Sequence, residues 1–218
     1  MPANVVALSV QNGSGGYTIA RRVAEALAFR YYDWEITSEA ARLAGVSPSE
    51  VLASERVPGF FERTMRRLGA MSTMTIEGGP GFSEPSPAMW STAIESLTSD
   101  DYRQFIQEVV RQLAADGSAV IVGHAAQYIL RDHPGVLKGF IHGSLPVRAE
   151  RHAREQGTSI DLALKALTQS DKERKHLMRT VYHLDWTDAS NYEVTFNTDH
   201  FSEDWVVDAI VSAADQLS

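Results

Sequence analysis

Apolar residues along this chain fall into two patterns, short unbroken runs and longer stretches with helical spacing. The short runs are rich in β-branched residues, which is typical of strands buried on both faces of a sheet. They predict strands at residues 5–8, 31–33, 119–123, 136–141 and 192–196. Helical spacing predicts helices at residues 19–27, 35–44, 60–68, 101–115, 124–130, 146–156, 161–182 and 203–217. Because strands alternate with helices, we expect an α/β fold with a parallel sheet covered by helices on both faces.

Residues 35–100 interrupt this alternation. Ser47 and Glu50 have the spacing of a capping box, which indicates a helix start. Residues 76–90 are rich in Gly, Pro and Ser, which indicates a loop. The length suggests a single domain over residues 1–218, with this region as a helical insertion.

The first predicted strand leads into a glycine-rich stretch, residues 11–18, which we name the glycine loop. From its second position it reads Asn12, Gly13, Ser14, Gly15, Gly16, Tyr17 and Thr18. A strand, a glycine-rich turn and a helix direct backbone N–H groups at a phosphate, and the helix N-terminus adds its partial positive charge. A full phosphate-binding loop reads G-x-x-x-x-G-K-[ST]; here Gly16 stands at the lysine position and Thr18 supplies a nearby hydroxyl. The loop fits either phosphate binding or an ordinary tight turn between strand and helix.

Further polar residues follow the other predicted strands. Ligands of such sheets bind beyond the carboxyl ends of the strands, so the glycine loop, Asp33, Gly123 with His124, and the residues after Ile141 are expected on one rim. Asp33 could line a ligand site or simply cap the following helix. His124 could contact a ligand or stand at a helix start without one.

The charge distribution limits the class of ligand that the chain is expected to bind. The chain has 28 acidic and 20 basic residues and a net charge of −8, which argues against binding a nucleic-acid polymer. Basic residues nevertheless cluster in two stretches, one with Arg148, Arg151 and Arg154, the other with Lys172, Arg174, Lys175 and Arg179. A local basic patch in an acidic protein fits a small anion better than a polymer. The spacing of three places the first group on one helix face, as a phosphate site or a solvated surface would require.

The chain has no cysteine, which excludes disulfides and thiol catalysis and is compatible with a cytoplasmic location. No apolar run approaches the ~20 residues of a membrane span, and the N-terminus lacks the basic residues of a signal peptide. We therefore expect a cytoplasmic protein without a membrane partner. The apolar helix faces at 60–70 and 101–115 would serve a homodimer as well as a core. The last helix is expected to carry Trp205 inward.

Three blocks of this sequence resemble one known family. They are residues 5–33 with Gly-Ser-Gly-Gly and Tyr-Tyr-Asp, residues 120–131 reading VIVGHAAQYILR, and residues 171–198 with DKER, DW, SNY and NT. In this order they resemble the cytidylate kinase-like family of P-loop proteins, over most of the chain except about 45–100. The resemblance implies a three-layer P-loop NTPase fold with a central parallel sheet and a helical lid at about 146–185.

The resemblance also implies two nucleotide sites. By position, residues 12–18 would bind the phosphates of the donor ATP, with Thr18 near Mg²⁺. Asp33, Gly123 and His124 would belong to the site of the acceptor.

In the same way, the resemblance assigns four residues to the reaction itself. Arg148 and Arg151 would stand at the start of the lid segment. Asp171 and Arg174 would lie beyond it and face the phosphates. Phosphoryl transfer needs in-line positioning and positive charge around the transferring group, and arginine supplies a planar fork for phosphate oxygens. Without a ligand, Asp171 and Arg174 would form only an i, i+3 surface ion pair.

Two positions depart from the family pattern. Gly16 lacks the lysine and its neighbour is Tyr17, where relatives often have arginine. His124 stands where relatives have an arginine that helps to hold the acceptor. Each change removes a fixed positive charge from a phosphate site.

The sequence therefore predicts a phosphotransferase that moves the γ-phosphate of ATP, with Mg²⁺, to a nucleoside monophosphate, by default CMP or dCMP, or to another small acceptor. Its partners would be small-molecule nucleotides. The alternative is a nucleotide-binding regulator or pseudo-kinase with little turnover, and a third reading is a structural module with an empty loop.

Overall fold

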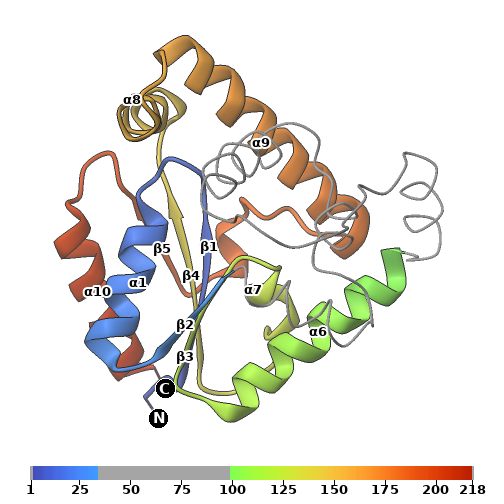
Figure 1. Cartoon of the computed structure of the whole chain (residues 1–218). Helices are drawn as coiled ribbons and strands as arrows, with labels where there is room; N and C mark the ends of the chain where they lie inside the picture. Colours follow the sequence, from blue (N-terminus) through green and yellow to red (C-terminus); the bar gives the residue numbers. More distant parts are fainter. Residues whose placement is uncertain (1, 34–98, 218) are drawn as a thin grey trace, which may run out of the picture.

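The computed structural model describes residues 2–33 and 99–217 (Figure 1). Several expectations lie outside these residues: the helices at 35–44 and 60–68, the helix start at Ser47 and the loop at 76–90.

Within the described residues, five parallel strands form one sheet in the order β2-β3-β1-β4-β5. The strands are β1 (Val5–Val10), β2 (Arg30–Tyr32), β3 (Ala119–Val122), β4 (Val136–His142) and β5 (Val194–Asn197). The central strand β1 pairs Val5 with Ala119 on one side and with Val136 on the other. All residues of β1 and β3 are buried, as expected for continuous β-branched runs.

Helices cover both faces of this sheet. They are α1 (Gly16–Leu27), α6 (Ser99–Asp116), α7 (Ala126–Ile129), α8 (Leu145–Gln156), α9 (Ile160–Tyr182) and α10 (Glu203–Gln216), with a 3-10 helix η1 (Ala189–Asn191). Val6 and Leu8 of β1 pack in one core cluster with residues of α1 and α10. Val5 and Ala7 point the other way and pack with α6 and α7. Figure 1 shows these pairs of helices on opposite sides of the strands, which confirms the expected α/β fold.

Helices α8 and α9 are consecutive and pack on each other beyond the carboxyl ends of β1 and β4 (Figure 1). Their contact is built from small and branched apolar residues: Ala149, Ala153, Ala163 and Leu167. Gly157 ends α8 with a φ of 60°, and the Ser159 side chain caps α9 by accepting a hydrogen bond from the Leu162 N–H.

Two local expectations were wrong. Helix α7 begins at Ala126 rather than at residue 124, because Gly123, His124 and Ala125 have φ values of 78°, 51° and 54° in the left-handed region. Trp205 does not point inward: it is 48% exposed and its ring stacks on Phe201 with centroids 4.3 Å apart.

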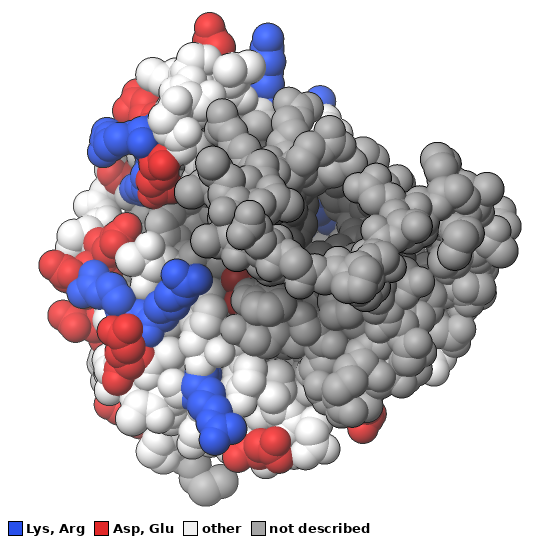
Figure 2. All heavy atoms as spheres, viewed as in Figure 1, with Lys and Arg blue, Asp and Glu red and all other residues white. Residues whose placement is uncertain are grey.

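The surface over α1 and α10 carries interspersed acidic and basic side chains (Figure 2). One pair, Arg22 and Asp204, joins the two helices at 2.6 Å. In the described part of the chain, every helix is too short or too polar to span a membrane.

Candidate nucleotide-binding site

The glycine loop connects the end of β1 to the start of α1 in a conformation that needs glycine. Gly13 and Gly15 have φ values of 78° and 76°, and Gly15 is the N-cap of α1 without a side-chain cap. Four backbone N–H groups here have no acceptor among the described residues, those of Gly13, Gly15, Tyr17 and Thr18. Unpaired N–H groups at a helix N-terminus form a site for an anion.

Gly16, at the lysine position of the loop, is a place where a side chain does not fit. It is buried, and a Cβ there would lie 2.5 Å from Cγ1 of Val10 and 3.2 Å from Cγ2 of Ile141. At Gly15, a Cβ would lie 2.7 Å from Oε1 of Glu203. The loop therefore excludes the lysine sterically, and any fixed positive charge must come from other elements.

Residues of β4 and just after β5 hold the loop in place through hydrogen bonds. Ser14 is fully buried; its Oγ accepts from the Gly16 N–H at 3.3 Å and donates to the Ile141 carbonyl at 3.4 Å. Thr198, which follows β5, donates its hydroxyl to the Ser14 carbonyl at 2.9 Å. These bonds fix the loop to the sheet.

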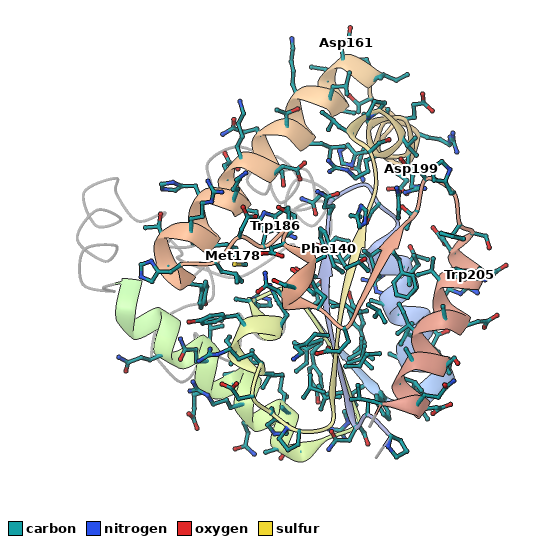
Figure 3. The ribbon with its side chains drawn as sticks, turned by 180° about the vertical axis from the view of Figure 1, so that it is seen from behind. Phe140, Asp161, Met178, Trp186, Asp199 and Trp205 are labelled. Carbon is teal, nitrogen blue, oxygen red and sulfur yellow. The ribbon has the colours of Figure 1, made fainter. Side chains whose placement is uncertain are left out.

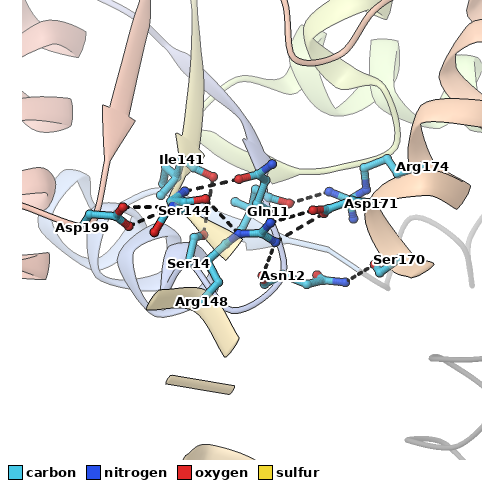
Figure 4. A network of polar contacts seen from close by, with 12 residues as sticks. Gln11, Asn12, Ser14, Ile141, Ser144, Arg148, Ser170, Asp171, Arg174 and Asp199 are labelled. Atoms are coloured by element: carbon cyan, nitrogen blue, oxygen red, sulfur yellow. Dashed lines mark hydrogen bonds and ion pairs between the residues drawn. The ribbon is translucent and has the colours of Figure 1, made fainter. Parts of the chain in front are cut away.

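Arg148 ties α8, α9 and the glycine loop together (Figure 4). Its side chain is 3% exposed and forms a fork with Asp171 of α9, with Nη2 and Oδ2 2.6 Å apart. Nη1 also donates to the Asn12 carbonyl at 3.0 Å, and Nε donates to the Gly143 carbonyl at 3.0 Å. A second link between the loop and α9 runs from Asn12 Nδ2 to Ser170 Oγ at 2.8 Å.

Two more arginines bind carbonyls in or next to the same loop. Arg151 donates to the Gly13 carbonyl at 2.9 Å and to Thr198. Arg174 of α9 donates to the carbonyl of Val10, the last residue of β1. The structure thus gathers three guanidinium groups around a loop that has no cation of its own.

The rim beside α8 holds a carboxylate and a histidine. Both oxygens of Asp199 accept from the Ser144 N–H, at 2.9 and 3.1 Å. Desolvation raises the pKa of the Asp199 carboxyl, but the bonds from Ser144 outweigh it and the net pKa is below its ordinary value. Burial lowers the pKa of His142, with Asp199 opposing the shift and Arg148 adding to it. Asp199 is therefore the charged anion here and His142 favours its neutral form.

Asp33 and His124, predicted for the acceptor, meet at the ends of β2 and β3. His124 Nε2 lies 3.0 Å from the Asp33 carbonyl, and Tyr31 donates its hydroxyl to Oδ2 of Asp33 at 3.3 Å. The Gly123 N–H donates to the Leu8 carbonyl at 2.9 Å and joins this rim to β1. Burial, and next Asp33, raise the pKa of Tyr31, so this hydroxyl remains a donor.

The other predicted loop residues line the start of α1. Thr18 is exposed in the first turn of the helix. A hydroxyl there fits the oxygen chemistry that Mg²⁺ prefers. Tyr17 donates its hydroxyl to Asn12 Oδ1 at 3.4 Å, which links two side chains of the loop.

Sequence reasoning expected the residues after Ile141 on this rim but did not single out Ser144, and it missed Thr198, Asp199 and Glu203. These three follow the carboxyl end of β5, where the same rule for ligand sites in parallel sheets could have pointed to them. These residues belong to no recognisable sequence motif. Their position next to the loop becomes visible only in the folded structure.

Comparisons with known proteins agree with this geometry. The profile of the cytidylate kinase-like family matches residues 5–200. The cytidylate kinase of Pyrococcus furiosus is 24% identical over 219 residues, 100% of this chain and 92% of that protein. The cytidylate kinase of Pyrobaculum calidifontis is 25% identical over 91% of this chain and 85% of its own length. The match to the cytidylate kinase of Methanopyrus kandleri, at 28% identity, spans 60% of that protein.

A crystal structure of an uncharacterized protein from Eubacterium ventriosum has a similar fold. The TM-score is 0.66 at 20% sequence identity, over 97% of this chain and 98% of that one. The match of the family profile to nine-tenths of the sequence identifies this protein: the chain belongs to the cytidylate kinase-like family.

Proposed function

We propose that this protein transfers the γ-phosphate of ATP to a nucleoside monophosphate, with CMP or dCMP as the acceptor. The observation that carries the proposal is the glycine loop, where four N–H groups before and within the first turn of α1 have no acceptor in the described part of the chain and three guanidinium groups lie around them. Family membership supports a kinase of nucleotides or small molecules. The names of the relatives support CMP as the acceptor.

In this proposal the loop binds the phosphates of the donor through its N–H groups and the dipole of α1. Arg151 and Arg174 neutralise charge that develops on the transferring group. Arg148 and Asp171 act through the loop, because their charged atoms bond each other and the Asn12 carbonyl. The Thr18 hydroxyl would hold Mg²⁺, which would supply further positive charge to the phosphate oxygens. Asp33, Gly123 and His124 face the acceptor.

A second candidate function is a nucleotide-binding regulator with little turnover. It is favoured by Gly16, where no lysine fits, and by the three arginines, whose donors already bind backbone carbonyls of the loop or of Val10 just before it. Losing one donor to a developing charge costs roughly 3–4 kcal/mol of transition-state stabilisation. Binding would survive this loss while the rate fell.

Thermal unfolding with ligands tests both. ATP, ADP, CMP, dCMP, UMP and AMP are each added with and without Mg²⁺, and a ligand at 100 times its dissociation constant should add about 2.7 kcal/mol of stability. Shifts with an adenine nucleotide and with CMP or dCMP, together with diphosphate formation in a coupled assay, would support the kinase. A shift without turnover would support the regulator, and no shift with any nucleotide would refute both.

A further inference from the structure

Trp186 lies directly against one of the arginines of the glycine loop. Its ring is 1% exposed, and the Cζ of Arg174 lies 5.1 Å above the ring centroid. Arg174 also donates to the carbonyl of Val10. The guanidinium therefore contacts both an indole face and the end of β1, and the ring attracts the cation.

The indole itself is fixed by neighbours that surround it (Figure 3). Phe140 of β4 meets it edge to face with centroids 5.4 Å apart, and Met178 of α9 belongs to the same buried cluster. Tyr192 stacks on Phe140 at 5.1 Å and donates its hydroxyl to the Trp186 carbonyl at 2.6 Å. These contacts leave the plane of the indole little freedom.

The indole N–H is buried without a hydrogen-bond acceptor in the described part of the chain. A buried donor without a partner is unfavourable, so a phenylalanine would fill this place at lower cost. Tryptophan offers the strongest aromatic face for a cation. The residue type therefore suits the contact with Arg174 better than it suits core packing.

We propose that Trp186 is a positioning residue that holds Arg174 at the start of the glycine loop, where its guanidinium supplies the charge that Gly16 cannot carry. This inference rests on the proposed function for its role in nucleotide binding. The contact should also stabilise the loop when no nucleotide is bound, because Arg174 joins α9 to Val10, the residue just before the loop.

A double-mutant cycle separates positioning from core packing. The variants are Trp186→Phe, Trp186→Leu, Arg174→Gln and the pair Trp186→Leu with Arg174→Gln. Met178→Ala is the matched control, since it opens the same buried cluster but keeps both the indole of Trp186 and the guanidinium of Arg174. For each, we measure the Kd of MgADP, the KM and kcat for ATP, and the melting temperature.

Trp186→Leu should weaken MgADP binding about tenfold, the size expected for a desolvated cation–π contact, and raise the KM for ATP more than it lowers kcat. Trp186→Phe should recover most of the affinity. With Arg174→Gln already present, Trp186→Leu should lower the melting temperature as before but leave the affinity unchanged. An equal loss of affinity in both backgrounds, or a loss as large in Met178→Ala, would overturn the inference.

Amide hydrogen exchange of Ser14 and Gly16, the two amides within residues 13–16 that have an acceptor among the described residues, tests the same idea without nucleotide. Trp186→Leu and Arg174→Gln should each speed exchange of the loop at least about threefold, and the double variant no further, with residues 119–122 of β3 as the reference for global opening. If the wild-type protein binds no nucleotide, the proposed function fails, and this exchange pattern decides the positioning role. Unchanged loop exchange in Trp186→Leu, or strictly additive effects, would refute it.

Discussion

Replacing Gly16 with alanine tests whether the loop excludes a side chain. The new Cβ would lie 2.5 and 3.0 Å from the two methyl carbons of Val10 and 3.2 Å from Cγ2 of Ile141, against an optimal 3.5–4.0 Å for carbon atoms. Val10 is 1% exposed and Ile141 is fully buried, and they are register partners on neighbouring central strands. Neither side chain can move without disturbing the sheet.

Two opposing effects determine how much Gly16→Ala changes the stability of the protein. Alanine in place of glycine in a helix gains up to about 1 kcal/mol, and less at the first position of α1. Overpacking of a well-filled core costs about 1–3 kcal/mol. We expect the overlap to win and Gly16→Ala to lose about 1–2 kcal/mol, which lowers the melting temperature of a chain of this size by about 2–8 °C.

Thermal and urea unfolding would measure this loss, with Val10→Ala as the background that removes the overlap. In that background Gly16→Ala should be neutral or stabilising, because the space is then open. Gly157→Ala is the matched control: its φ is 60° and its Cβ would meet nothing within 4 Å, so its cost should be the same in both backgrounds. The reasoning would be refuted if Gly16→Ala were as stable as the wild type, or if Gly16→Lys increased the affinity for ATP.

Three further outcomes follow from the charged groups. Arg148→Ala should lower the unfolding free energy, measured by chemical denaturation, by about 3 kcal/mol, because it leaves Asp171 and two carbonyls without their donor. Arg154→Ala, at an exposed position of the same helix, should change it by no more than about 0.5 kcal/mol. Burial lowers the pKa of His152 below 6.5, so the unfolded state binds this proton at a higher pH than the folded state does. Stability should therefore fall as the pH drops below about 6.5. His152→Gln should reduce this fall, measured as melting temperatures between pH 7.5 and 5.5. Hydrogen bonds from Thr187 and then Arg179 lower the pKa of Asp185 to about 2. Its contribution to folding stability is therefore complete above pH 3.8 and is lost as the pH falls towards 2. Asp185→Asn should reduce the loss of stability in acid over that pH range.

The strands could be predicted from the sequence because burial on both faces demands unbroken apolar runs, as in β1 and β3. The start of α7 could not, because no sequence rule places His124 and Ala125 in the left-handed region. Trp205 was placed inward because it is large and apolar, yet it shields its ring by stacking on Phe201 instead. Such local solutions depend on neighbours that a helical pattern does not reveal.

The arginines of the site illustrate the same limit. Spacing correctly placed Arg148 and Arg151 together on α8, and both reach the glycine loop. The sequence offered two interpretations of Asp171 and Arg174, as groups that face the phosphates or as an ion pair on one helix. In the structure Asp171 binds Arg148, and Arg174 binds the end of β1. The absence of a lysine at Gly16 was visible in the sequence; only the packing of Val10 shows that the position is closed.

Positive charge outside the loop can still act on an anion inside it. The C=O and N–H of one trans peptide point in opposite directions, so a donor on the Asn12 carbonyl aims the Gly13 N–H the other way. Arg148 is that donor, and the Gly13 N–H has no acceptor among the described residues. A charge-assisted bond also polarises the peptide and strengthens the opposite N–H as a donor. A buried arginine paired with Asp171 can therefore contribute to phosphate binding without touching the phosphate, which would let this loop hold an anion although its lysine position is closed.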